Sequence, residues 1–540
     1  PAAPPPSLGA PEPRLASYAC LASHRSSMAM KRCLTSIVLG LALLGKTALT
    51  AAKDDAAINE NLLKWFTAQG GVIDGVTVNQ FDGMGRGVQA TKSLSSHDMV
   101  LKMPLTMVVS RATAIATATT DAARYIYEDM EREEDVIALF IMREKARGAA
   151  SEWAPYIDAL PEFIPQAAYF PRSAFEKLQD KAFAQQASER GQGISKRFKK
   201  LQDNIEELVD DLDAQSQKWF ASEPAYKWAL AVVSSRALTF RGKRYLAPIA
   251  DMFNYSPHPD TRKAASGEFF LTHHVLDTSP SPSDGDGAGI GPSLTIHADR
   301  DTAAGEQLFE DYGDNTNQIY IDHHGFVPDH NPFECVYTRL SVPSNDGVLH
   351  TDLARSARLE LLKIMQVPTE PAPCIRNGHG ASWPTQAFTW LQVMTLTDVE
   401  AKRCTMAVSN RRIEKSCPLI AGYGGYGGGG LPDSWEPSVE QLSMILPGAS
   451  ARVGSFPSTY ESDLSLIRQQ APSKQRLTYE EALSVKYRIA QKKVALDLVA
   501  SLEAQIDGKA WDYHTKSSVE QSVETSVEVD AMGEPIEPAS

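Results

Sequence analysis

The sequence predicts an α+β protein with a β-rich first domain, a helical block inserted into that domain, and a helical second domain. Short runs of β type, separated by glycine-rich turns, follow one another at Val76–Val78, Val88–Ala90 and Met99–Met103. Helical periodicity replaces them over about 120–228. Strand-like runs then return at Tyr245–Pro248, Phe269–Thr272, Leu294–His297 and Gln307–Phe309. This order indicates helices inserted between the strands of one domain.

Changes of pattern set the expected boundaries. The β-rich domain should cover 58–331, starting with an amphipathic helix over Ile58–Ala68, and its helical insert lies at about 120–228. After Pro332 the pattern is mostly helical, so we expect the second domain over 332–510. The segment 511–540 contains Ser-Val-Glu three times and is net negative, which predicts a disordered acidic tail.

Two helical stretches lead to specific expectations. Thr478 and Glu481 form a capping box for a helix over Tyr479–Leu502. One buried stripe is expected from the spacing of Ala482, Val485, Ile489, Leu496, Val499 and Leu502, with Lys492 and Lys493 on the exposed face. The charged run Lys196–Asp213 is interpreted as a solvated helix face in preference to a binding patch.

The N-terminal 51 residues suggest a leader. Residues 1–27 are rich in Pro, Ala and Ser and are expected to be a disordered or non-native extension. Within 28–51, Lys31-Arg32 precedes thirteen mostly apolar residues and then small residues, which is typical of a signal peptide. Such a stretch is too short for a membrane-spanning helix, which needs about 20 residues, so no stable membrane insertion is expected. The leader favours the secretory pathway or a plastid. A misassigned start would instead favour the cytoplasm or nucleus.

Composition narrows the class of partner. Lys and Arg number 53 against 67 Asp and Glu in 540 residues, a net charge of −14. Nucleic acid is therefore disfavoured, because binding a phosphate backbone requires a basic face. The hydrophobic fraction of 43% and the mean hydropathy of −0.27 fit a soluble globular chain, and we expect a monomer. Four of the six cysteines would remain after leader removal, Cys335, Cys374, Cys404 and Cys417, so two disulfides could form in any pairing.

Three ordered clusters stand out as candidates for chemistry. The first is Gly83–Gly87, just before a predicted strand. The second combines Ser235-Arg236 with the stretch Pro248–Tyr255. The third contains Gly305-Glu306, Asp311-Tyr312-Gly313, Asn317 and Gly325-Phe326. Each cluster alone indicates only tight turns or a close approach of the backbone.

Taken together, these clusters resemble the SET-domain protein methyltransferases of the class typified by the Rubisco large-subunit and actin-histidine enzymes. The segment Trp153–Pro161 resembles a further motif of that class, and the likeness extends over about Leu62–Gln505. The resemblance implies that the β-rich domain is a SET domain with an inserted helical subdomain. It also implies that the all-α C-terminal domain binds the protein substrate.

The resemblance further implies a site for S-adenosylmethionine (SAM). Met84, Gly85 and Arg86 would hold the cofactor through their backbone, with Arg236 near its carboxylate. Asp251, Met252, Phe253, Asn254 and Tyr255 would contact the adenine and methionine parts, and His324 lies at a further cofactor-binding position. Tyr312 matches the catalytic tyrosine that points at the methyl group. An arginine fork suits a carboxylate, and a phenol with backbone carbonyls can stabilise a sulfonium without a metal.

Three positions depart from the class pattern. Tyr255 replaces a usual histidine, His324 replaces a tyrosine of the Rubisco enzyme, and Asp55 stands where the actin-histidine branch has an arginine that contacts SAM. The change at His324 leaves open whether lysine or histidine is the target, and Asp55 implies a lower affinity for SAM. The changes at Tyr255 and His324 favour an alternative, a catalytically impaired SET fold that binds a partner. No metal is expected at His323-His324, because neighbouring side chains of a strand point to opposite faces.

The implied reaction is an in-line methyl transfer to a side-chain nitrogen of a protein substrate. A free lysine with a pKa near 10.4 is neutral about once in 2,500 molecules at pH 7, a penalty of roughly 4.6 kcal/mol. A desolvated channel lowers that penalty and aligns the nucleophile. The net negative charge of the chain would attract a basic substrate segment.

Overall fold

A computed structural model describes residues 55–209, 212–240, 242–257, 274–277, 292–341, 352–376, 384–409, 436–468 and 477–508. The chain divides into two units, 1–60 and 61–540, and the elements considered below belong to the second. The leader, the run Phe269–Thr272, Cys417 and the tail 511–540 lie outside the described residues. Residues 61–68 are helical, as the apolar pattern of Ile58–Ala68 predicts.

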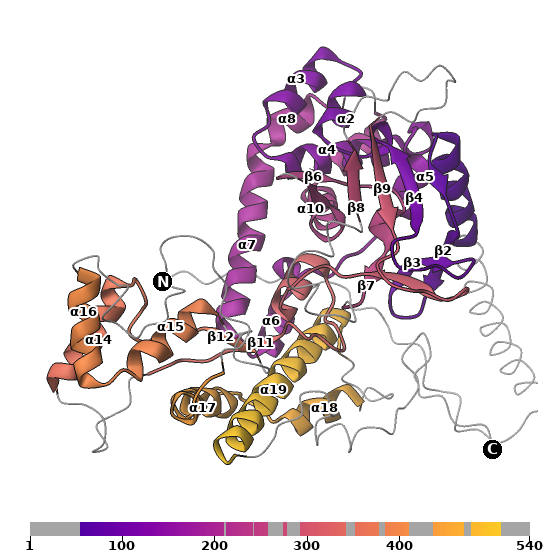
Figure 1. The fold of residues 1–540 in the computed structure, drawn as a ribbon. Coiled ribbons are helices and arrows are strands. Elements are labelled where there is room, and N and C mark those ends of the chain that lie inside the picture. Colours follow the sequence, from indigo (N-terminus) through magenta and orange to yellow (C-terminus); the bar gives the residue numbers. More distant parts are fainter. Residues whose placement is uncertain are drawn as a thin grey trace, which may run out of the picture. The chain divides into compact units, whose positions relative to one another are not determined.

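Two four-stranded sheets form the β-rich part (Figure 1). The first has the order β1 (Val72–Ile73), β4 (Met99–Pro104), β9 (Ser293–His297) and β8 (His274–Asp277). The second has the order β2 (Val76–Phe81), β3 (Gly85–Ala90), β10 (Gln307–Glu310) and β7 (Asn254–Tyr255). Neighbouring strands are antiparallel, except that β10 and β7 run parallel. This parallel pairing places the residues after β10 beside the end of β7.

Most of the expected strands are confirmed, and one is only partly correct. β2, β3, β4, β9 and β10 cover the predicted runs. The run Tyr245–Pro248 contributes only its first residue, because β6 (Lys243–Tyr245) ends there after pairing with β5 (Leu238–Phe240). Pro248 has no N–H to donate to a sheet.

Helices occupy the chain between the early strands and β5. They are α2 (Arg111–Ala116), α3 (Asp121–Asp129), α4 (Glu133–Arg147), α5 (Ala154–Ala159), α6 (Arg172–Leu178), α7 (Lys181–Lys200), α8 (Gln202–Glu206), α9 (Ala214–Phe220) and α10 (Glu223–Arg236). The run Lys196–Asp213 is not one helix, because α7 ends at Lys200 and α8 ends at Glu206. α4 and α10 pack together as the buried helices of this block, with unbroken apolar runs from Val136 to Met142 and from Ala229 to Val233.

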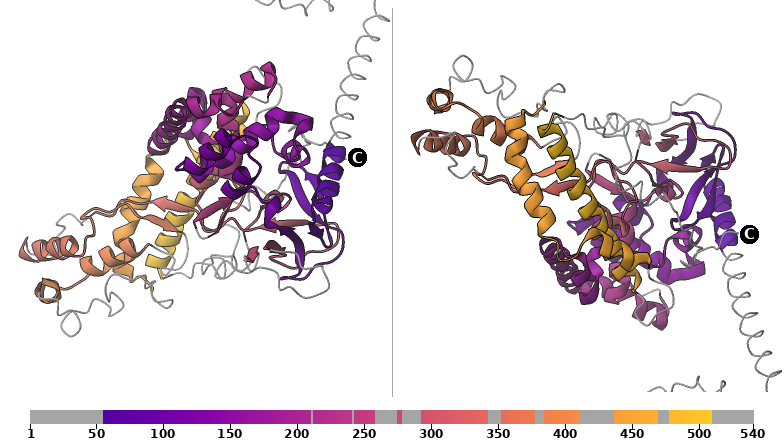
Figure 2. Two further views of the ribbon diagram at one scale, coloured as in Figure 1. Left: turned by 90° about the horizontal axis from the view of Figure 1, so that it is seen from above. Right: turned by 90° about the horizontal axis from the view of Figure 1, so that it is seen from below.

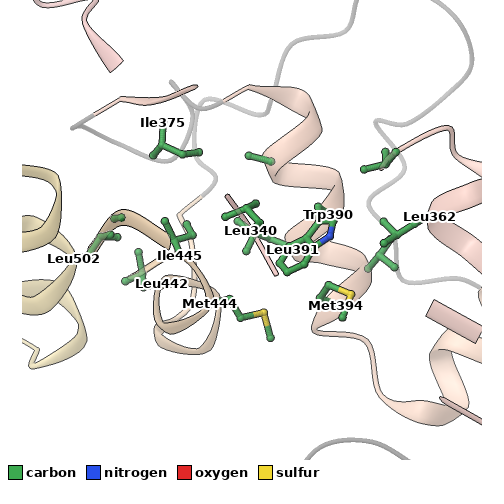
Figure 3. Close-up of a cluster of buried hydrophobic side chains, with 14 of the residues drawn as sticks. Leu340, Leu362, Ile375, Trp390, Leu391, Met394, Leu442, Met444, Ile445 and Leu502 are labelled. Carbon is green, nitrogen blue, oxygen red and sulfur yellow. The ribbon is translucent and has the colours of Figure 1, made fainter. Parts of the chain in front are cut away.

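The C-terminal part is mainly helical, and the α+β class is confirmed. Its helices are α14 (Asp352–Ile364), α15 (Thr385–Met394), α16 (Asp398–Ser409), α17 (Val439–Gly454), α18 (Tyr460–Arg468) and α19 (Tyr479–Ile506). A core around Trp390, Leu391 and Ile445 joins these helices except α18 (Figure 3). This part was expected to be all-α, but it also contains a two-stranded sheet of β11 (Cys335–Tyr337) and β12 (Cys374–Arg376). A disulfide between Cys335 and Cys374 joins the two strands, and Cys404 is disulfide-bonded as well.

α19 belongs to two hydrophobic cores at once. Its first half places Leu483 and Tyr487 against Phe183 of α7, and its second half places Leu498 and Leu502 in the core around Trp390. α19 packs against α6, α17 and α18 along its length (Figures 1 and 2). It therefore ties the inserted helices to the C-terminal helices. Within the described ranges, none of the helices combines the length and the apolar character that a membrane crossing requires.

The capping box of α19 is confirmed, but its predicted stripe is wrong. Only Val485 and Leu502 of the six residues are fully buried, while the other four are half-buried. Lys492, expected on the exposed face, is 2% exposed. The helix is covered on more than one side, and polar side chains with buried partners occupy part of that surface.

A buried ion network explains why Lys492 faces inward. Asp463 of α18 accepts hydrogen bonds from Arg488 at 3.0 and 2.7 Å and also pairs with Lys492. Arg488 Nη1 donates to Lys177 O at 2.7 Å, and Lys492 Nζ donates to Gln179 Oε1 at 3.1 Å. Burial alone would raise the pKa of Asp463, but the hydrogen bonds from its two cationic partners hold it below its usual value. The network therefore joins α18, α19 and the end of α6.

We predict that Asp463→Ala lowers the free energy of unfolding by about 3 to 5 kcal/mol, because two buried cations lose their shared carboxylate. The matched control is Asp497→Ala, which removes a partner of Lys493 at 3.2 Å on the same helix. That change should cost about 0.5 kcal/mol. Chemical denaturation followed by circular dichroism measures both values, and similar losses for the two variants would contradict the prediction.

Candidate functional site

The hairpin between β2 and β3 is tied to β7 by side-chain packing around Gly87. A Cβ added at Gly87 would lie 2.6 Å from Gln307 Nε2 and 2.8 Å from Asn254 Nδ2, so these side chains would have to shift to admit a larger residue. Asn254 Nδ2 donates to Arg86 O at 3.2 Å, and Arg86 Nη1 donates to Ala159 O at 3.3 Å. Gly83 and Gly85 have φ values of +69° and +73°, the left-handed region that favours glycine, which explains the glycine-rich turn of this hairpin.

A buried carboxylate, Asp251, lies at the centre of the second cluster. Its carbonyl oxygen accepts a hydrogen bond from Arg236 Nη1 at 2.7 Å, and its Oδ1 lies 3.8 Å from the same nitrogen. The phenol of Tyr156 on α5 donates to Asp251 Oδ2 at 2.5 Å. Ile249, two residues earlier, has a φ of +67°, a strained conformation for a β-branched residue. Asp251 thus joins α5, α10 and the turn before β7.

Burial sets the protonation of this carboxylate. Desolvation raises the pKa of Asp251 to about 6, although Arg236 and the hydrogen bond from Tyr156 act in the opposite direction. The carboxylate is therefore largely ionised at pH 7 but becomes protonated in mildly acidic solution.

An aromatic cluster, made of Tyr255, Tyr312, Tyr320, His324 and Phe326, lies at the ends of β7 and β10. The rings of Tyr312 and His324 stack at 5.1 Å, and those of Tyr255 and Tyr320 lie 4.6 Å apart. Phe326 packs 5.2 Å from Tyr320. Aromatic faces of this kind attract cations, including sulfonium and ammonium groups.

The polar atoms of the cluster are held in neutral states. Tyr312 Oη donates to Phe253 O at 2.6 Å, and burial raises the pKa of Tyr312, so its phenol stays protonated at neutral pH. His324 Nδ1 lies 3.1 Å from Ser235 O, so this nitrogen donates. Burial, together with the neighbouring His323, lowers the pKa of His324 to about 4. The cluster can therefore surround a cation without adding a positive charge of its own.

The loop that carries Tyr312 is fixed from the C-terminal side. Asn315 Nδ2 donates to Tyr312 O at 2.8 Å, and Asn331 Nδ2 donates to Asn315 O at 2.9 Å. Arg376 of β12 forms an ion pair with Asp314. The Cys335–Cys374 disulfide joins β12 to β11, so the C-terminal part supports the position of the loop.

Most of the predicted site residues come together in the structure. Hydrogen bonds join Asn254 to Arg86 and Arg236 to Asp251. A hydrogen bond joins Tyr312 to Phe253, and ring contacts join it to Tyr255 and His324. Gly85 pairs with Phe81 across the hairpin, and Met84, 51% exposed, lies in the turn, where its N–H donates to Phe81 O at 3.1 Å. Met252 is 1% exposed and belongs to the buried core.

Sequence reasoning missed several supporting residues. Tyr156, which donates to Asp251, lies inside the Trp153–Pro161 motif, so this motif could have indicated its position at the site. Asn315, Asn331 and Arg376 stand in no recognisable pattern, and only the fold brings them to the Tyr312 loop. These residues hold the Tyr312 loop through hydrogen bonds and an ion pair, and their side chains are not part of the aromatic cluster.

The expected geometry of the two adjacent histidines is wrong. His323 and His324 lie in a π-helical turn over Tyr320–His324, not in a strand. Both rings face α10. His323 Nδ1 lies 3.1 Å from Ser234 Oγ, and His324 contacts the carbonyl of the next residue, Ser235. In the part of the chain that the structure describes, no group of three or more His, Cys, Asp or Glu is arranged to hold a metal ion.

The raised pKa of Asp251 predicts how the stability of the fold depends on pH. Because folding raises this pKa from 3.8 to about 6, the folded state binds the proton more tightly than the unfolded state. The resulting stabilisation is fully present below pH ~4 and is lost as the pH rises through about 6. From pH 4 to pH 7, wild-type stability should fall by roughly 2.4 kcal/mol relative to Asp251→Asn. Urea denaturation at several pH values measures this difference, and a constant difference would contradict the prediction.

Comparisons with known proteins agree on the fold. No family model matches the chain. The chain is 22% identical over 465 residues to the actin-histidine N-methyltransferase of Gallus gallus, covering 84% of this chain and 69% of that protein. It is 26% identical over 327 residues to SET domain-containing protein 4 of Homo sapiens, covering 55% of this chain and 67% of that protein.

Solved structures give the same result. Rubisco LSMT bound to AdoMet matches with a TM-score of 0.52 at 15% identity, covering 86% of this chain and 99% of that one. The SET domain of LSMT bound to MeLysine and AdoHcy matches with a TM-score of 0.54, also at 15% identity, with the same coverage. The chain is thus a distant homologue of actin-histidine N-methyltransferases and of SET domain-containing protein 4, and it has the SET-domain fold of LSMT.

Proposed function

We propose that this chain is a SAM-dependent protein N-methyltransferase that methylates a lysine side chain, with histidine as the alternative target. The observation that carries the proposal is the neutral aromatic cluster around Tyr312, next to the Arg236–Asp251 pair. Its setting in a SET fold, in a distant homologue of actin-histidine N-methyltransferases, supports the proposal.

The residues fit the chemical groups of SAM. The Arg236 side chain is 19% exposed, and its guanidinium keeps donors beyond the one given to Asp251 O, so it can also hold a carboxylate. The rings of Tyr312, His324 and Phe326 suit a sulfonium. When bound, SAM supplies the methyl group.

The side chains of the aromatic cluster favour transfer of that methyl group because they orient the reacting groups. They do not act by removing a proton. The raised pKa of Tyr312 excludes its phenolate as a base at neutral pH. The Tyr312 hydroxyl, fixed by Phe253 O, and the carbonyl of Ser235 offer oxygen atoms that orient an incoming amine. The methyl group passes from sulfur to nitrogen, the amine proton leaves to solvent, and S-adenosylhomocysteine is released.

Two observations point to different target residues. The homologues at the highest coverage are named for histidine, whereas a matching LSMT structure holds methyllysine. We propose lysine because the aromatic cluster is rich in groups that accommodate an ammonium. Incubation of the protein and labelled SAM with a cell extract, followed by mass spectrometry of the labelled peptide, identifies the residue.

We predict that Tyr312→Phe lowers single-turnover methyl transfer by roughly 100-fold, because the hydroxyl that orients the reacting groups is lost. SAM affinity measured by calorimetry should stay within about threefold, since the ring remains. The matched control is Tyr320→Phe, which removes a hydroxyl directed at Gly313 O at 3.2 Å in the same cluster. Equal rates for both variants would remove Tyr312 from the mechanism.

A second candidate function is a partner-binding SET fold without turnover. The replacements at Tyr255 and His324 favour it, because they alter the aromatic cluster itself. SAM at 100 times its Kd would stabilise a methyltransferase by roughly 2.7 kcal/mol in thermal unfolding. The absence of a shift at millimolar SAM would support this second function instead.

The compartment stays a proposal drawn from the leader. The Cys335–Cys374 disulfide supports an oxidising environment, such as that of the secretory pathway. N-terminal sequencing of the mature protein tests this, because removal of 28–51 would demonstrate processing of the leader.

A further inference from the structure

We propose that a positively charged cavity in the helical block binds a multiply charged anion that carries phosphate or carboxylate groups. The cavity has a volume of about 800 Å³. Its walls come from the start of α4, the second half of α7, the end of α10, β6 and the π-helical turn. This inference goes beyond methyl transfer and does not depend on it.

Cations outnumber carboxylates in the lining. Six cationic side chains line the cavity: Arg132, Arg190, Lys196, Arg197, Lys200 and Arg244. Three carboxylates, Glu131, Glu134 and Asp135, accompany them. This local excess of positive charge lies in a chain with a net charge of −14. The cavity is therefore opposite in sign to the molecule as a whole.

The carboxylates do not fully satisfy the arginines. Glu134 is shared by Arg132 at 3.9 Å, Arg197 at 3.8 Å and Arg244 at 3.3 Å. Arg197 Nε lies 3.4 Å from Asp135, whose pKa is raised by burial. Most of these distances exceed those of charge-assisted hydrogen bonds, which are about 2.7 to 2.9 Å. An anion placed among these arginines would supply the acceptors that they lack.

The cavity wall is fixed and partly apolar. Arg190 Nη1 donates to Asp322 O at 2.6 Å and lies 3.0 Å from Asp322 Oδ2, and its Nη2 donates to Ser234 Oγ at 3.2 Å. This guanidinium is therefore held in place and its charge is partly balanced. Ile194 and Leu230 are each 5% exposed in the same lining. Apolar neighbours reduce the local dielectric constant and strengthen the attraction between the arginines and an anion.

Arginine forks match the geometry of phosphate and carboxylate oxygens. The volume lies within the usual range for small-ligand sites, about 300 to 1,000 Å³, and exceeds what one phosphate fills. We therefore assign a ligand with several charges. Lys196 and Lys200, part of the run expected to be a solvated face, line the cavity and extend its positive charge outward.

The experiment measures binding of tripolyphosphate and citrate to the full chain by calorimetry. In the double variant Arg197→Gln/Arg244→Gln, affinity should fall by about tenfold or more, because charge-assisted contacts are lost. A second double variant, Lys196→Gln/Lys200→Gln, alters only exposed side chains and should weaken binding without unfolding risk. Lys199→Gln is the matched control, since Lys199 is exposed on α7 but does not line the cavity.

An acidic peptide and its Gln-substituted analogue distinguish the source of the anion. Tighter binding of the acidic peptide than of tripolyphosphate would assign the cavity to a protein segment, and the reverse order would assign it to a free anion. The ring resonances of His323, which lines the cavity, should shift saturably with either ligand. No saturable binding of any probe at millimolar concentration, or equal weakening by Lys199→Gln, would overturn the proposal.

Discussion

The buried carboxylate of Asp251 is the constraint on which the candidate site depends. A charge in this position is costly, and the cost is tolerated because Tyr156 and Arg236 approach it from separate helices. The same contacts fix the end of α10 and the turn before β7. The parallel pairing of β7 with β10 then places Tyr312 beside Phe253. The position of the aromatic cluster therefore depends on these two strands.

α10 has functional side chains on two sides of its final turn. Ser235 and Arg236 contact the aromatic cluster and Asp251, while Ser234 meets Arg190 and His323 at the charged cavity. Neighbouring residues of one helix thus belong to two environments of different charge. Any ligand that shifts Ser234 or His323 would act within one residue of the contact between Ser235 and His324.

Local patterns in the sequence were sufficient to predict β2, β3, β4, β9 and β10 and the capping box of α19, and the family resemblance named Tyr255, Tyr312 and His324 of the aromatic cluster but not Tyr320. They failed where a side chain is placed by distant partners. Lys492 belongs by composition to an exposed helix face, but Asp463 and Gln179 provide buried partners that no periodicity reveals. The histidine pair was misplaced for a related reason, since a π-helical turn has no simple sequence signature. The ordered motifs indicated the candidate residues around Tyr312, whereas the contacts of Asn331 and Arg376 with that loop required the tertiary fold.

The membership of α19 in two cores affects how the chain can fold. Phe183 is made early in synthesis, yet its partner Tyr487 is added near the end. Long sequence separation slows folding, because the intervening chain must be ordered before the contact forms. Until α19 arrives, α7 exposes apolar side chains that favour aggregation, so the nascent protein has a prolonged need for protection by chaperones.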